Sequence, residues 1–348
     1  MALVMVQGHA FETLLSPEAR ANVVYQFQMI FHGSTAPGFL FASGFVAGLP
    51  RAPLSLTASL RRARRMLFVL GVGYALHLPY FSLWKTLVEA TPAQRAQLFA
   101  CDALQVIALC QLIVIGLQWI AGARWIGVAG ALTLVLLAAG PAVWGSGVSA
   151  RVHPTLAAYL DASSGSTFPF FPFGAFVLAG TVAGAALGRQ DPRRRRRRAL
   201  RGGVALLALG MLLALLLHGR LDFWTISPAY VALRLGGLLL VLLAVEQAAR
   251  RGLPGLKPLA LLGHETLLVF VLHLYLLYGW IVGAAPFGQY VGRLAFAGAH
   301  VALLALLPVL LVAAWLWHAF KVHAPREASL ALAFITAAFL HELLTRPW

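Results

Sequence analysis

Charged side chains are scarce in this sequence. Only 11% of its 348 residues are Asp, Glu, Lys or Arg, and 60% are hydrophobic, whereas roughly 25% of the residues in a soluble domain are charged. Apolar stretches of about 17–25 residues, long enough to cross a bilayer, recur from end to end with no soluble domain between them. Because only closed hydrogen-bonding structures are stable in lipid, these runs predict transmembrane helices and exclude a soluble enzyme.

Cysteine and catalytic signatures are also sparse. Cys101 and Cys110 are nine residues apart on one predicted helix, which puts them on opposite faces, about 13 Å apart, and excludes a disulfide between them. The sequence has no Walker loop and no GxSxG, HExxH or CxxC motif. These absences argue against a nucleotide-driven pump, and we expect no metal site.

The apolar runs predict an all-α, polytopic bundle of about 11 helices, which forms one domain over residues 1–348. The predicted spans are residues 1–15, 24–49, 66–84, 98–120, 125–144, 168–188, 202–217, 228–245, 259–282, 293–317 and 328–344.

Basic residues gather in four of the predicted connecting loops, which are residues 51–65, 189–201, 250–257 and 321–326. With these spans, all four loops fall on one side of the membrane, and the weakly charged loops 85–97, 146–167, 218–225 and 284–289 fall on the other. Because Lys and Arg accumulate on the cytoplasmic side, the pattern predicts a cytoplasmic amino terminus and an extracytoplasmic carboxyl terminus.

The formal net charge of +16 resides in these short loops. Without a soluble domain to present a groove, we expect no nucleic-acid partner. The arginine run at residues 193–198 is expected to set topology and contact anionic headgroups; docking the phosphates of a cytoplasmic donor is the alternative. Scarce Lys beside abundant Arg, Ala, Leu and Gly favours a GC-rich bacterium, and hence the inner membrane.

Several polar side chains fall within the predicted spans, where they are costly and normally mark function. They are predicted at a similar depth, in the outer half of the membrane, and they are His9, Glu12, His32, His77, Asp102, Gln105 and Arg234. Together they predict a polar pocket open to the outside. Taken singly, each has a structural explanation, such as a histidine bonded to a backbone carbonyl or Asp102 acting as a helix cap.

His273 lies mid-membrane in the segment "PLALLGHETLLVFVLHLYLLYG", residues 258–279. A histidine at this depth can relay protons, ligate a metal or brace two helices, and the sequence leaves these roles open.

Five blocks, in order along the chain, resemble the membrane acyltransferases related to heparan-α-glucosaminide N-acetyltransferase. They are "ALVMVQGHAFETLL", "FHGSTAPGFLFASGFVAGL", "CDALQVIALCQL", "FPFFPFGAFVLAGTVAG" and "LLGHETLLVFVLH". The resemblance implies a helical bundle that passes an acyl group, usually acetyl from acetyl-CoA, to an acceptor at the far side of a membrane. It also implies that His32 is the essential histidine, that His9 matches a first-helix histidine of bacterial relatives, and that Asp102 and Gln105 match an Asp-x-Leu-Gln element.

Acyl transfer needs a base for the acceptor proton and positive charge or donors for the oxyanion. We expect His32 or His9 to be the base or an acyl carrier, with Asp102 orienting the imidazole. Expected substrate-binding residues are Glu12, Gln105, Arg234 and His273, and expected donor-binding residues are Arg61, Arg62, Arg194 and Arg195. Acyl-CoA is expected as a substrate and not as a permanent cofactor; the other expected partners are the bilayer, a sugar or glycan acceptor and a second copy in a homodimer.

Two other classes of protein remain open. A transporter also carries buried polar residues and broken helices, and Pro37 fits that pattern. A non-catalytic scaffold is the third, because relatives usually begin the first helix with an Asp-x-x-Arg-Gly stretch that is not in this sequence.

Overall fold

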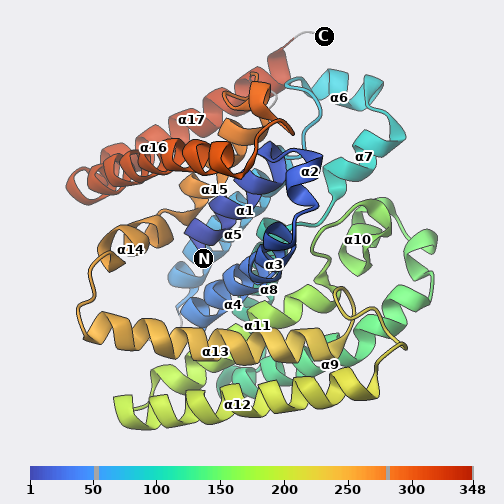
Figure 1. Cartoon of the computed structure of the whole chain (residues 1–348), viewed down its shortest axis with the longest axis vertical. Coiled ribbons are helices and arrows are strands. Elements are labelled where there is room, and N and C mark those ends of the chain that lie inside the picture. The colour runs from blue at the N-terminus through green and yellow to red at the C-terminus, as the bar shows by residue number, and fades with distance from the viewer. Residues whose placement is uncertain (51–54, 280–282, 347–348) are drawn as a thin grey trace. The chain divides into compact units, whose positions relative to one another are not determined.

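The computed structural model describes residues 1–50, 55–279 and 283–346, and in these residues the chain is α-helical, as predicted (Figure 1). The helices are α1 Ala2–Leu14, α2 Pro17–Arg20, α3 Val23–His32, α4 Thr35–Gly48, α5 Leu56–Ala75, α6 Leu83–Glu89, α7 Pro92–Phe99, α8 Ala103–Ile120, α9 Trp125–Gly145, α10 Pro154–Leu160, α11 Phe170–Gly188, α12 Pro192–Leu216, α13 Pro228–Arg250, α14 Leu256–His264, α15 Thr266–Tyr278, α16 Phe296–His323 and α17 Pro325–Thr345. Parts of the predicted loop 51–65 and of the predicted span 259–282 lie outside the described residues.

The predicted count of about 11 spans is not confirmed. Within the described residues, seven helices are long and apolar enough to cross a membrane, and the bent pair α14 and α15 makes an eighth if it is one span. The predicted span 24–49 is two helices, because the chain turns at Gly33 and Ser34 between α3 and α4. Gly and Ser are poor helix residues, so the helix stops at this point although the apolar run continues through it.

The chain divides into two compact units. Unit 1 consists of Met1–Thr35, Leu78–Thr91 and Gly252–Trp348, and unit 2 consists of Ala36–His77 and Pro92–Arg251. Each unit is therefore built from segments that are distant in sequence. The prediction of one domain over residues 1–348 stays a prediction.

In unit 1, α1 packs against α3, α15 and α16. The last turn of α1 is held by the loop before α16. The backbone N–H of Gly292 donates to the carbonyl oxygen of Thr13, and the backbone N–H of Leu294 donates to the carbonyl oxygen of Leu14. Gly292 has a φ of +67°, a left-handed conformation that glycine adopts without strain. These bonds satisfy carbonyl groups that the end of a helix leaves without partners.

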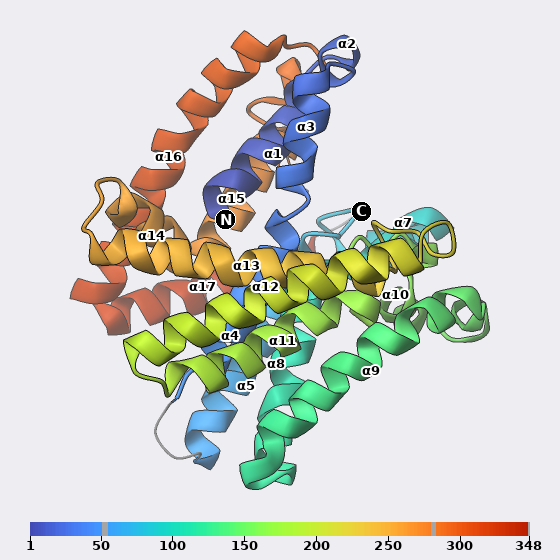
Figure 2. The same cartoon turned by 60° about the horizontal axis from the view of Figure 1, so that its bottom comes forward.

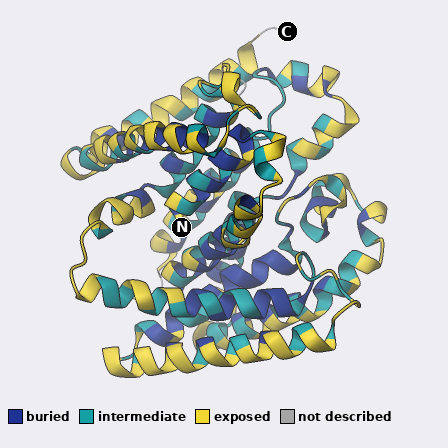
Figure 3. Cartoon of the chain, in the orientation of Figure 1, coloured by how far each residue is buried: buried dark blue, intermediate teal, exposed yellow. Residues whose placement is uncertain are grey.

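In unit 2, α11 is buried along most of its length (Figure 3) and crosses α4 at four glycines. A methyl group added at Gly44 or Gly48 on α4, or at Gly180 or Gly184 on α11, would lie 1.9–2.2 Å from a carbonyl oxygen of the other helix. The two backbones are therefore in direct contact, as small residues spaced four apart allow in membrane proteins.

Helix α12 lies along α13 in the same unit (Figure 2). Gly203 and Gly236 face each other across this pair, since a methyl group at Gly236 would lie 2.8 Å from the carbonyl oxygen of Gly203. The rest of α12 exposes large apolar side chains, including Leu200, Val204 and Leu215. This face is suited to contact with lipid.

Candidate active site

Three histidines from three helices of unit 1 lie together. His9 is on α1, His32 is the last residue of α3, and His273 is on α15. The ring centroids of His9 and His273 are 5.1 Å apart, and those of His9 and His32 are 5.7 Å apart in an edge-to-face arrangement. The ring of Tyr278 lies 6.2 Å from that of His9. We call His9, His32 and His273 the histidine cluster.

Hydrogen bonds determine which nitrogen of His9 is basic. His273 is fully buried, and its Nδ1 lies 2.8 Å from the carbonyl oxygen of Val269, so Nδ1 carries a proton and donates. Since a buried charge is costly, the ring is neutral and its Nε2 accepts. His9 Nδ1 lies 3.0 Å from this Nε2 and must be the donor. The lone pair of a neutral His9 is therefore on its Nε2.

His32 lies directly against the backbone of α1. An ideal Cβ at Gly8 would be 1.6 Å from His32 Nδ1, so only glycine leaves room for this imidazole. His32 Nδ1 is buried and has no hydrogen-bond partner among the described residues. Glycine at position 8 thus lets the imidazole of His32 lie beside that of His9.

Asp102 and Gln105 belong to unit 2, at the start of α8. Asp102 is the N-cap residue, and its backbone N–H donates to Gln105 Oε1 at 3.3 Å, as in a capping box. Asp102 Oδ2 lies 2.9 Å from His77 Nε2. The side chain of His77 is 11% exposed and that of Asp102 is 29% exposed, and Gln105 is buried against Gly73. The imidazole that Asp102 orients in this unit is that of His77.

Arg234 lies on α13 of unit 2. Its guanidinium is 5.2 Å from the ring centroid of Tyr230 and 6.0 Å from that of Trp224. The negative faces of the two rings attract the positive charge of Arg234. Asp222, in the loop before α13, accepts hydrogen bonds from the Trp224 backbone and from Thr225.

The four arginines expected to bind the donor are all in unit 2. Arg61 is exposed, and Arg62 Nη1 donates to Gln118 Oε1 at 2.9 Å. Arg194 pairs with Asp191 at 3.3 Å. Arg195 pairs with Glu246 at 2.5 Å.

Glu12 is exposed on α1, in unit 1. In the part of the chain that the structure describes, no group of three or more His, Cys, Asp or Glu side chains is arranged to hold a metal ion.

Sequence reasoning missed two structural partners. Gly8 was not recognised as the position that accommodates His32, although a glycine beside a histidine within a helix is a signal for close packing. His77 was expected in the polar pocket, but its pairing with Asp102 was not expected, because the two residues are 25 positions apart, in the turn after α5 and at the N-cap of α8.

The chain matches a family model described as "Acyltransferase domain" over residues 1–318, which include the histidine cluster and the Asp102–His77 pair. No curated protein and no solved structure matches the chain significantly. These comparisons do not confirm the resemblance to heparan-α-glucosaminide N-acetyltransferase, which rests on the five sequence blocks. Together with the membrane-spanning helices, the match shows that the chain belongs to a family of membrane acyltransferases.

Proposed function

We propose that the protein moves an acyl group, expected to be acetyl, from acyl-CoA to a hydroxyl or amine of an extracytoplasmic or envelope sugar. The observation that carries the proposal is the His9–His273 hydrogen bond, because it orients a basic imidazole nitrogen in a chain of the acyltransferase family. The sugar acceptor and the acetyl group follow from the resemblance of the five sequence blocks.

In the proposed reaction, His9 Nε2 takes the proton of the acceptor hydroxyl or amine as that group attacks the thioester carbonyl. The new C–O or C–N bond forms, the C–S bond breaks, and the CoA thiolate recovers the proton from the imidazolium. Imidazole suits both transfers because its ordinary pKa is near neutrality.

His273 is proposed as a positioning residue. Its Nε2 accepts from His9 Nδ1 and so holds the His9 ring in one tautomer and one orientation. His32 remains the second candidate for the base or for an acyl carrier, since its ring is edge-on to that of His9.

The remaining expected residues are proposed in supporting roles. Asp102 would hold the His77 imidazole, while Glu12, Gln105 and Arg234 would contact the acceptor or donor. Arg61, Arg62, Arg194 and Arg195 are proposed to attract the phosphates of CoA. Because Arg194 and Arg195 already pair with carboxylates and Arg62 donates to Gln118, the exposed Arg61 is the strongest candidate of the four.

The membrane is proposed to be a bacterial inner membrane, with a cytoplasmic amino terminus and an extracytoplasmic carboxyl terminus. The four basic segments predicted as loops support this orientation, and several of their described residues lie at helix ends.

The test measures acyl incorporation into envelope glycans by mass spectrometry. The glycans are taken from cells that carry the wild-type chain, His9→Ala, His32→Ala or no copy of the gene. We expect His9→Ala to lower incorporation by a factor of about 10² or more, the usual contribution of a positioned base. His341→Ala is the matched control, because His341 is exposed on α17 and outside the histidine cluster. Full activity in both His9→Ala and His32→Ala would contradict the proposal.

His273→Ala provides a separate readout of positioning. It should leave a smaller but measurable activity whose pH profile is shifted, because His9 would no longer be held in one tautomer. A profile identical to that of the wild type would show that His273 only packs.

A transporter remains the second candidate because the apolar helices α14 and α15 are bent by 86° at the break between them, and discontinuous helices are common at transporter binding sites. Binding of acyl-CoA to the purified chain supports the enzyme. Solute counterflow without any acyl transfer supports the transporter.

A further inference from the structure

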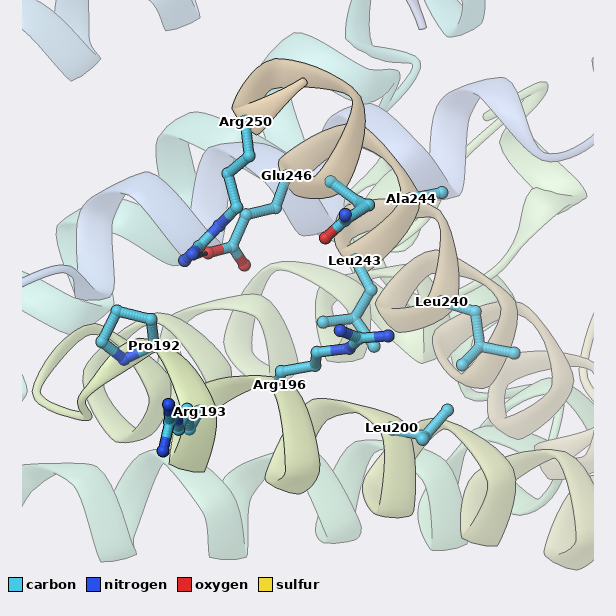
Figure 4. A pocket seen from close by; sticks show the side chains of 10 residues that line it. Pro192, Arg193, Arg196, Leu200, Leu240, Leu243, Ala244, Glu246 and Arg250 are labelled. Atoms are coloured by element: carbon cyan, nitrogen blue, oxygen red, sulfur yellow. Dashed lines mark hydrogen bonds and ion pairs between the residues drawn. The ribbon is translucent and has the colours of Figure 1, made fainter. Parts of the chain in front are cut away.

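A hollow of about 400 Å³ lies between α12 and α13 in unit 2 (Figure 4). It is lined by Pro192, Arg193, Arg196, Leu200, Leu240, Leu243, Ala244, Glu246, Gln247 and Arg250. We call it the arginine hollow. It is formed by residues of unit 2, whereas the histidine cluster is in unit 1.

The polar lining of the arginine hollow is positively charged. Arg193 and Arg196 come from the first turns of α12, and Arg250 comes from the end of α13. Glu246 is the acidic residue of the lining, and it is neutralised from two sides, by Arg250 at 2.7 Å and by Arg195 at 2.5 Å. Within the described residues, Arg193 and Arg196 have no carboxylate partner. Their charges are available to an anion.

The other part of the lining is apolar. Leu200 and Leu240, from facing helices, line the hollow to the right of Arg196 in Figure 4, on the side away from Arg193. Leu200 is 47% exposed, and further along α12 Val204 and Leu215 are exposed as well. The arginine hollow thus joins guanidinium groups to an apolar strip that continues along the outer face of a membrane helix.

We propose that the arginine hollow binds one anionic phospholipid, with its phosphate among Arg193, Arg196 and Arg250 and an acyl chain against Leu200 and Leu240. Basic pockets at the ends of membrane helices recognise anionic headgroups, and apolar surface beside them accepts the chains. Among the described residues that line it, none has an aromatic side chain on which an adenine ring could stack. The chemistry of the lining therefore favours a phospholipid over CoA.

The experiment uses the full chain, purified and delipidated in a neutral detergent, and counts bound lipids by native mass spectrometry. Phosphatidylglycerol and phosphatidylcholine are titrated separately, with inorganic phosphate and CoA as competitors. The test variant is Arg193→Ala with Arg196→Ala. The matched control is Arg197→Ala with Arg198→Ala, which removes the same charge from exposed positions outside the hollow.

We expect phosphatidylglycerol to bind at one site in preference to phosphatidylcholine. The test variant should bind it about 25-fold more weakly, at about fivefold per arginine, and the control variant should match the wild type. Equal losses in the two double variants would overturn the proposal in favour of general electrostatic attraction. Displacement of the lipid by CoA at similar concentrations would overturn it in favour of a donor site.

Discussion

At the scale of single residues, Gly8 determines the geometry of the histidine cluster. A side chain at this position and the imidazole of His32 cannot occupy the same space, because a Cβ would lie 1.6 Å from His32 Nδ1 and 2.0 Å from its Cε1. Glycine normally weakens a helix interior by about 0.5–1 kcal/mol relative to alanine. Its presence in α1 is explained by the close approach of α3.

Gly8→Ala should therefore lower acyl transfer toward the level of His32→Ala, while the chain still folds. The added methyl group displaces the His32 ring, and the higher helix propensity of alanine offsets part of the strain. Acyl incorporation and thermal unfolding measured on the same preparation check this. Gly263→Ala on α14, where an added Cβ meets no neighbour within 4 Å, is the control and should keep full activity. Wild-type activity in Gly8→Ala would show that the position of His32 is unimportant.

At the scale of helices, the break between α14 and α15 is stabilised by an ionic cluster of unit 1. Glu265 lies at the break, and its side chain is only 3% exposed. Lys321 Nζ donates to Glu265 Oε2 at 2.6 Å, and His318 Nδ1 lies 2.8 Å from Oε1. Both partners come from α16 and are 41% exposed. Without the ion pairs, the buried carboxylate would have almost no contact with solvent, whereas the side chains of Lys321 and His318 would still be partly exposed.

This asymmetry predicts that Lys321→Met destabilises the protein more than Glu265→Gln does. Lys321→Met leaves a buried carboxylate without its main cation, which costs roughly 3 kcal/mol. Glu265→Gln leaves a lysine that water can still reach, and it costs about 1 kcal/mol. The measurement is the free energy of unfolding in detergent for each variant. Equal losses, or a larger loss for Glu265→Gln, would mean that the burial of Glu265 is not the controlling factor.

At the scale of the whole molecule, charge near the helix ends predicts which side of the membrane each end faces. The arginine run 193–198 begins α12, whereas the residues around α10 carry few charges. Native Cys101 and Cys110 are both 0% exposed, so a thiol reagent should detect only an introduced cysteine. This absence of background makes the proposed orientation directly measurable.

In intact cells, a membrane-impermeant maleimide should label Ala162→Cys and not Arg197→Cys, because positive loops stay in the cytoplasm. Both positions are exposed. Permeabilising the membrane should make Arg197→Cys reactive as well, and the unaltered chain checks that the buried native cysteines are not labelled. The reverse labelling pattern would invert the proposed topology.

Properties that depend on local composition could be read from the sequence. Hydropathy predicted a helical membrane protein, and the ordered blocks predicted an acyltransferase, a class that the family match supports. The number of spans could not be read in this way, because apolar composition continues through Gly33 and Ser34 where the helix ends. Hydropathy reports the preference of side chains for lipid, and it does not report where backbone hydrogen bonding stops.

The sequence by itself determined that the chain is a helical membrane protein and which of its polar side chains are expensive to bury, since both follow from residue type alone. Only the tertiary structure decided which of these side chains meet. His9 and His273 are 264 residues apart, and Asp102 at the start of α8 contacts His77 in the turn after α5. Such partners are chosen by how helices pack, through contacts like those of Gly8 with His32, and packing depends on many side chains at once.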